Sequence, residues 1–142
     1  MPLPVIQKLI EEKNIIIAAG GGGIPVYRTS KGMLRGIEAV IDKDYSASLL
    51  ARELDVDIYI NLTGVDSVYV HFGKKKQKPL SVLTVKEAKK YAEAGEFSPG
   101  SMGPKVLSAV QFVERSGKEV LITSAGALNQ ALNGELGTRI VP

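Results

Sequence analysis

The sequence contains no cysteine, and only one of its 142 residues is a histidine. The absence of cysteine excludes a disulfide scaffold, a thiolate zinc site, an iron–sulfur cluster and a cysteine nucleophile. It also favours a reducing compartment, so we expect a cytoplasmic location. The histidine, His71, has no partner at a metal-ligand spacing, so we assign it no role and expect no metal site built by the protein.

Long apolar runs are also missing. The longest, such as residues 15–19, are far too short to span a bilayer. No basic stretch precedes an apolar one at the start of the sequence, so we expect no signal peptide. The net charge of +3 suits anionic ligands but is too small to indicate nucleic acid. We therefore expect neither a membrane nor a nucleic acid as a partner.

Helical and strand patterns alternate along the sequence. Helices are predicted at residues 4–13, 44–54, 84–94 and 104–115, with a short one near 128–132. Buried strands are predicted at residues 15–19, 58–62, 68–70, 120–122 and 138–140, and a hairpin at 26–28 and 37–40 around a turn at 30–32. Strands separated by helices favour right-handed crossovers. The sequence therefore predicts one α/β domain, a three-layer αβα sandwich with a mostly parallel sheet.

Local signals define three of these helices. Thr84 and Glu87 have capping-box spacing, and Gly95 follows the last turn of the same helix. The helix at 104–115 has an apolar stripe and ends before a glycine; the stripe is Val106, Val110 and Val113, and the glycine is Gly117. In the helix at 44–54, we expect one set of side chains to face inward (Tyr45, Leu49, Leu50) and another to face outward (Ser46, Arg52, Glu53).

Four glycines follow the first predicted strand: Gly20, Gly21, Gly22 and Gly23. Ligands of open α/β sheets bind at the carboxyl ends of strands, and glycines let backbone N–H groups approach an anion. Pro25 stands where the dinucleotide fingerprint requires its third glycine, and no Walker A lysine follows. Two interpretations stay open, an anion-binding loop and a sterically demanding turn without a ligand.

Two lysines lie at predicted helix N-termini. Lys43 stands between Asp42 and Asp44, and Lys105 follows the glycine-flanked turn at residues 100–104. Phosphoryl transfer needs fixed positive charge, with carboxylates to hold it in place, and a helix N-terminus favours phosphate. The alternatives are ordinary, because acids are common N-caps and lysines are common on surfaces.

Two further segments are candidates for ligand contact. Residues 63–66 follow the second predicted strand, so they either contact a nucleotide or simply turn the chain. The basic run at residues 74–78 is more typical of a solvated loop than of a phosphate site.

Taken together, these segments resemble the carbamate kinases of the amino acid kinase family. Residues 18–26 are similar to their glycine loop, 38–44 to their lysine–aspartate motif and 62–66 to their nucleotide-side turn. Residues 97–105 are similar to their second lysine motif and 137–140 to their final strand. Order and spacing both fit. The resemblance implies that residues 1–142 form a single nucleotide-binding lobe of the amino acid kinase fold, and that the N-terminal acceptor lobe is absent.

The resemblance also implies a reaction and roles. The whole enzyme would transfer a phosphoryl group between carbamoyl phosphate and ADP, giving ATP and carbamate, with Mg²⁺. Lys43, Asp44 and Lys105 would be catalytic. The nucleotide would lie near Thr63, Gly64, Asp66, Met102 and Lys105. Gly20, Gly21, Gly22 and Gly23 would line the acceptor side. We further expect a homo-oligomer, with a two-fold dimer as the default, or pairing with a separate N-terminal half.

Two other function classes are considered. A non-catalytic nucleotide-binding module would keep the nucleotide lobe without an acceptor site. A dinucleotide-dependent oxidoreductase is disfavoured by the failed glycine fingerprint.

Overall fold

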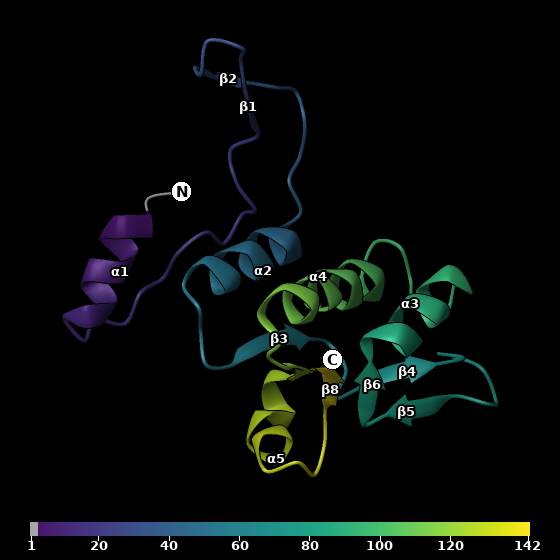
Figure 1. Cartoon of the computed structure of the whole chain (residues 1–142). Helices are drawn as coiled ribbons and strands as arrows, with labels where there is room; N and C mark the ends of the chain where they lie inside the picture. The colour runs from purple at the N-terminus through teal and green to yellow at the C-terminus, as the bar shows by residue number, and fades with distance from the viewer. Residues whose placement is uncertain (1–2) are drawn as a thin grey trace.

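The computed structural model describes residues 3–142, in which helices and strands alternate (Figure 1). The helices are α1 (Leu3–Glu11), α2 (Lys43–Glu53), α3 (Val85–Glu93), α4 (Met102–Ser116) and α5 (Leu128–Leu132), with a 3-10 turn at Ala125–Ala127. The strands are β1 (Val26–Arg28), β2 (Leu34–Gly36), β3 (Tyr59–Thr63), β4 (Val68–Val70), β5 (Lys78–Leu80), β6 (Val82–Thr84), β7 (Val120–Ser124) and β8 (Thr138–Val141). Each predicted helix is confirmed to within two residues at either end.

The main sheet has four strands in the order β3-β7-β8-β6. The pairs β3–β7 and β6–β8 are parallel, whereas β7–β8 is antiparallel. Strands β4 and β5 form a separate antiparallel ribbon, in which β4 confirms the predicted strand at 68–70. The predicted α/β class with a mostly parallel sheet is therefore confirmed.

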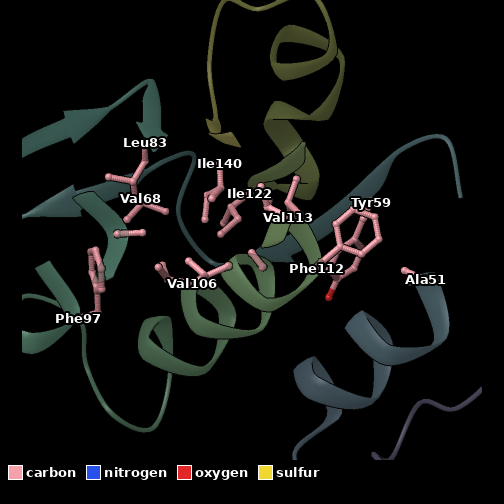
Figure 2. Packing of buried hydrophobic residues seen from close by; sticks show 14 residues of the cluster. Ala51, Tyr59, Val68, Leu83, Phe97, Val106, Phe112, Val113, Ile122 and Ile140 are labelled. Carbon is pink, nitrogen blue, oxygen red and sulfur yellow. The ribbon is translucent and has the colours of Figure 1, made fainter. Parts of the chain in front are cut away.

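Helices cover both faces of this sheet. Figure 1 shows α2 and α4 on one side of it and α5 on the other. The core lies between α4 and the sheet, where Val113 lies beside Ile122 and Ile140 (Figure 2). The ring of Tyr59 on β3 lies 5.3 Å from the ring of Phe112. Helix α4 thus packs across the strands of the main sheet.

The predicted helix-end signals are confirmed. The Thr84 hydroxyl accepts from the backbone N–H of Glu87, and the Glu87 carboxylate accepts from the backbone N–H of Thr84. Gly95 and Gly117 follow α3 and α4 in the left-handed region, with φ of 72° and 70°. The predicted valine stripe of α4 is buried.

The strand predicted at residues 15–19 is wrong. The segment is irregular, and the side chains of Ile15 and Ile17 are 98% and 101% exposed. A strand forms only against a neighbour that pairs with its backbone. Within residues 3–142, none of the three sheets includes this segment, so its β-branched composition is not enough to make it a strand.

The second strand of the predicted hairpin is also displaced. It lies at Leu34–Gly36 instead of 37–40, whereas the first strand, Val26–Arg28, is as predicted. The turn at residues 30–32 closes tightly, because the Gly32 N–H donates to the Thr29 carbonyl at 2.9 Å. This brings Leu34 directly opposite Arg28. All residues of both strands are exposed, and the hairpin projects away from the sheet (Figure 1).

The predicted inward face of α2 is wrong. Its buried residues are Asp44, Ser46, Ser48 and Ala51, whereas Leu49 is 39% exposed. Helix α2 packs on α4 through these small side chains, and the Ser48 hydroxyl donates to the Ser108 carbonyl at 2.8 Å. A polar helix face that is satisfied by its neighbour looks solvent-facing in sequence, which explains the error.

Strand β3 confirms the second predicted strand, shifted by one residue, but it is not buried on both faces. Tyr59 and Asn61 are buried, whereas Leu62 is 47% exposed. In the part of the chain that the structure describes, β3 is an edge strand that pairs with β7. One face of β3 therefore packs on α2 and α4 while the other remains open.

Candidate functional site

Three polar side chains from distant parts of the sequence meet beneath the helices. The Lys105 ammonium lies 3.0 Å from Asp44 Oδ1 and 3.0 Å from Asn61 Oδ1. The Asn61 Nδ2 group donates to Asp44 Oδ1 at 3.2 Å. The side chains of Asp44 and Lys105 are only 9% and 11% exposed. We call these three residues the Asp–Lys–Asn cluster.

Secondary structure places each member of the cluster. Asp44 lies in the first turn of α2, where the Asp42 side chain caps the helix by accepting from the Asp44 N–H at 2.7 Å. Lys105 lies in the first turn of α4, and Asn61 lies in the middle of β3. Two helix N-termini therefore converge on one point of the sheet, and both favour an anion there.

Lys43 adds a second positive charge at the outer side of the cluster. Its ammonium lies 3.7 Å from Asp44 Oδ2, and its side chain is 62% exposed. The Asp44 carboxylate is thus shared by a buried lysine and a solvated one. A solvated Lys105, the alternative considered from the sequence, is not what the structure shows.

Tyr59 supports the cluster from the core. Its hydroxyl donates to the Asp44 carbonyl at 3.4 Å. Burial, and then the nearby Asp44 carboxylate, raises the pKa of Tyr59 from 10.0 to about 12. The tyrosine is therefore a neutral donor throughout the physiological range.

The raised pKa of Tyr59 makes stability depend on alkaline pH. Between pH 10 and about 12 the unfolded chain releases a proton that the folded chain retains, so stability falls as pH rises through this window. An ultraviolet titration of tyrosinate should include a step near pH 12 that comes from Tyr59, and Tyr59→Phe should remove that step. A step near pH 12 of unchanged amplitude in the Tyr59→Phe variant would contradict the assignment.

A cavity of about 520 Å³ is lined by residues that neighbour the cluster on β3 and α4. Thr63 lines it and lies two residues beyond Asn61, on the same face of β3. Met102 lines it too and lies one turn before Lys105 on α4. The wall also carries aromatic, glycine and charged residues: Gly64, Tyr69, His71, Phe72, Lys74, Glu96 and Phe97. Apolar rings beside a few polar groups are typical of a small-molecule site.

A second, more open groove of about 370 Å³ lies on the other side of the cluster. Lys43 and Asp44 line it together with Ala19 and Gly20 of the glycine loop. The remainder of its wall is apolar and comes mainly from α2. The cluster therefore lies between two hollows: Asp44 lines the groove beneath the glycine loop, and the cavity is reached through Thr63 on β3 and Met102 on α4.

One glycine lies tightly against the segment that leads into α2. Gly22 has φ of 101°, and a Cβ there would lie 2.0 Å from the Ile41 carbonyl oxygen. Gly21 has ordinary backbone geometry, and nothing lies within 4 Å of the position its Cβ would take. Both the left-handed backbone and the close contact therefore require glycine at position 22.

Gly22→Ala is expected to displace the glycine loop, with Gly21→Ala as the matched control. The backbone amide chemical shifts of residues 41–43 should change in the first variant and stay near those of the parent in the second. Global stability should change little in either, because residues 15–24 contribute little to the core. Equal shifts in the two variants would contradict the close contact at Gly22.

The other sequence-predicted residues lie around the first cavity. Thr63, Gly64 and Met102 line it directly, whereas Asp66 stands behind the wall and accepts from the Tyr69 hydroxyl at 2.7 Å. This hydrogen bond raises the pKa of Tyr69. Lys74 of the basic run also reaches the cavity, although the run as a whole is exposed, as predicted.

Sequence reasoning missed several residues of the site. His71, which was given no role, lines the cavity, and its Nδ1 lies 3.0 Å from the Glu96 carboxylate. Asn61 was overlooked within an apolar run. It could have been found because it is the one amide in this predicted strand and alternates with residues on its buried side. A buried amide without a hydrogen-bond partner is costly, so a polar partner was to be expected there.

A comparison with family profiles decides the classification. The profile of the amino acid kinase family matches residues 3–124. The chain belongs to the amino acid kinase family. The resemblance seen in the sequence is thus confirmed at the level of the family.

Individual relatives within the family are carbamate kinases and a carbamate kinase-like protein. The chain is 47% identical over 138 residues to the carbamate kinase-like protein YahI of Escherichia coli, covering 97% of this chain and 44% of that protein. It is 49% identical over 137 residues to the carbamate kinase of Thermoplasma volcanium, covering 96% and 45%. The chain therefore spans less than half the length of these curated relatives.

Solved structures of the family give the same picture. The carbamate kinase from Giardia lamblia bound to AMP-PNP superposes with a TM-score of 0.89 at 40% identity, covering 98% of this chain and 48% of that chain. The UMP kinase from Bacillus anthracis shares the fold alone, at 16% identity and a TM-score of 0.64.

Among residues 3–142, no helix is long and apolar enough to cross a membrane.

Proposed function

We propose that this chain binds an adenine nucleotide and supplies the nucleotide side of a carbamate kinase-type phosphotransferase, which interconverts ATP and carbamate with ADP and carbamoyl phosphate. The observation that carries the proposal is the Asp–Lys–Asn cluster, placed between two hollows at the N-termini of α2 and α4. The high identity to carbamate kinases supports the choice of substrate class. The AMP-PNP bound to the Giardia relative supports the choice of nucleotide.

The two hollows divide the substrates. The nucleotide lies in the cavity beside Thr63, Gly64 and Met102, and Asp66 supports the wall through Tyr69. Carbamate or carbamoyl phosphate lies in the groove beneath the glycine loop, Gly20, Gly21, Gly22 and Gly23, whose first glycine lines that groove. The transferred phosphoryl group then passes between them, beside Asp44.

The lysines stabilise charge during the transfer. The transferring phosphoryl group spreads negative charge over its oxygens, and catalysis consists mainly of positioning and electrostatic stabilisation. Lys105 lies one turn after Met102, which lines the cavity, and Lys43 lines the groove. Asp44 orients both ammonium groups. The lysines, and not Asp44, contact the transferred phosphoryl group.

Mg²⁺ is proposed to arrive with the nucleotide. Among residues 3–142 no three metal-binding side chains form a cluster. The Asp44 carboxylate already accepts from Lys105 and Asn61 and faces Lys43, so it is a poor magnesium ligand. Magnesium at nucleotide sites is commonly held by the phosphates, water and few protein groups, and its charge would offset that of the phosphates.

A second candidate is a nucleotide-binding module without catalysis. It is favoured by the difference between the two hollows, because the cavity beside β3 and α4 is the larger and more enclosed of the two. In this case the nucleotide cavity is used and the groove beneath the glycine loop is not. In the first candidate, pairing with a separate N-terminal half would supply the rest of the acceptor side.

Two measurements test the proposal. Calorimetric titration with ADP and AMP-PNP should show binding by the 142-residue chain, whereas NAD should not bind. A coupled assay of ATP formation from carbamoyl phosphate should show little turnover by the chain alone. Turnover should rise when the segment of the Thermoplasma volcanium carbamate kinase that the chain does not match is added. Absence of nucleotide binding would refute both candidates, and binding without turnover in the mixture would favour the module.

A further inference from the structure

We infer that Asn61 is a positioning residue that aims the Lys105 ammonium at a phosphate of the bound nucleotide. The inference rests on the proposed function for the identity of the ligand. Its geometric part, that Asn61 fixes the direction of the lysine, stands on contacts within the chain.

The orientation of the Asn61 amide follows from the charges of its partners. An ammonium group can only donate hydrogen bonds and an ionised carboxylate can only accept them. The amide oxygen therefore faces Lys105 at 3.0 Å and the amide nitrogen faces Asp44 at 3.2 Å. The reverse orientation would place donor against donor and acceptor against acceptor, so the cluster fixes the amide in one state.

The position of Asn61 makes this bridge rigid. The residue is 6% exposed and lies in the middle of β3, which pairs with β7 over its whole length. A strand position holds a side chain more tightly than a long lysine stem holds its own ammonium group. Asn61, held by the sheet, thus restricts the motion of the ammonium group at the end of the flexible Lys105 side chain.

The bridge also leaves Lys105 with a defined remaining donor. An ammonium group has three N–H groups, and within residues 3–142 two of them have acceptors, at Asp44 and Asn61. With two directions fixed, the third N–H is fixed as well. Met102, one turn earlier on the same helix, lines the nucleotide cavity, so this remaining donor is available to an anion entering from there.

Asn61→Leu tests the geometric part without any ligand. The substitution keeps the size and burial of the side chain and removes both hydrogen bonds. We expect the order parameter of the terminal methylene of Lys105, measured by NMR relaxation, to fall clearly in this variant. The matched control is Ser48→Ala, which removes a buried hydrogen bond between α2 and α4 that does not reach the ammonium group, and it should leave the order parameter unchanged. An unchanged value in Asn61→Leu would overturn the inference.

The functional part of the inference predicts that a substitution at Asn61 weakens the binding of ADP but not that of adenosine. Adenosine shares the base and sugar of ADP but has no phosphate. Asn61→Leu should weaken ADP binding about tenfold, the effect of losing a well-placed charged hydrogen bond, and should leave adenosine binding unchanged. Asn61→Asp should weaken ADP binding further, because it adds a negative charge beside the phosphates. An equal loss for ADP and adenosine would mean that Asn61 only maintains the fold, and would overturn the inference.

The two arms also separate this inference from the proposed function. If the parent chain binds neither ADP nor adenosine, the proposed function fails, and the NMR measurement still decides whether Asn61 orients Lys105. If the parent chain binds ADP and both Asn61 variants bind it equally well, the proposed function stands and the inference fails.

Discussion

Lys105→Ala is expected to lower the free energy of unfolding by about 3 kcal/mol, because it leaves the buried Asp44 carboxylate without its nearest cation. Removing one partner of a buried ion pair is costly since the other charge remains in a poorly solvated site. Urea unfolding of the variant and the parent chain measures the difference. The same substitution should abolish detectable ADP binding, since the lysine is the proposed donor to phosphate.

Lys43→Ala is the matched control for stability. The Lys43 side chain is 62% exposed, and exposed ion pairs contribute at most about 1 kcal/mol, so the unfolding free energy should change little. ADP binding should still weaken, because a charge near the phosphoryl group is lost. A double variant, Asp44→Asn with Lys105→Ala, should recover part of the stability lost in Lys105→Ala. Equal unfolding energies for the parent chain and Lys105→Ala would show that the pair is not buried in solution.

The second large effect concerns assembly. At micromolar concentration the purified chain is expected to scatter light with at least twice the monomer mass of 15.2 kDa, or to pair with a separate N-terminal half. Apolar side chains before α2 are exposed to an unusual degree, including Ile15 (98%), Ile17 (101%), Ile24 (86%) and Val40 (96%). Strand β3 also presents an unpaired edge in the described part of the chain. Such surfaces mark association sites.

Charge placed on the exposed segment tests the source of this association. Replacing Ile15 and Ile17 together by lysine should reduce the scattering mass toward 15.2 kDa and leave the unfolding free energy unchanged. A control with Lys8→Ala and Lys13→Ala alters charge nearby without removing apolar surface. A parent chain that is a stable monomer and binds no hydrophobic dye would contradict the prediction.

The sequence predicted well the features that are decided by near neighbours. The capping box at Thr84 and Glu87, the glycine after α4 and the valine stripe of that helix involve residues a few positions apart, so their physics is local. The order of the helices, and with it the fold class, followed from the same local patterns, whereas strands β5 and β6 were not predicted.

The errors concern features that depend on distant partners. The apolar run at residues 15–19 has the composition of a strand, yet strand formation depends on a pairing edge that the described residues do not give it. The buried face of α2 is polar because α4 offers it hydrogen bonds from residues about 60 positions away, as at Ser48 and Ser108. Neither partner can be identified from the local pattern.

The candidate site shows the same division. Lys43, Asp44 and Lys105 could be singled out because they lie at predicted helix starts, within segments that resemble the two lysine motifs of the carbamate kinases. The burial of Lys105 and the bridge through Asn61 could not, since both arise where α2, α4 and β3 meet in space. Because the pair is buried, losing Lys105 is expected to cost stability, which a lysine on the surface would not.

The main hydrophobic cluster has its first member at Ala51, and the hydrophobic residues packed around it begin at Ala47. The residues from α2 onward thus supply most of the hydrophobic burial, whereas the residues before α2 supply mostly exposed surface. Mutations in helix α1 and in the hairpin can change these exposed segments at little cost to the folded lobe, whereas Gly22 in the loop between them is constrained by its contact with Ile41. Substitutions in the stretch that carries the core are expected to destabilise the fold. Substitutions in α1 and the hairpin are expected to change the surface that the chain offers for association and to leave the fold intact.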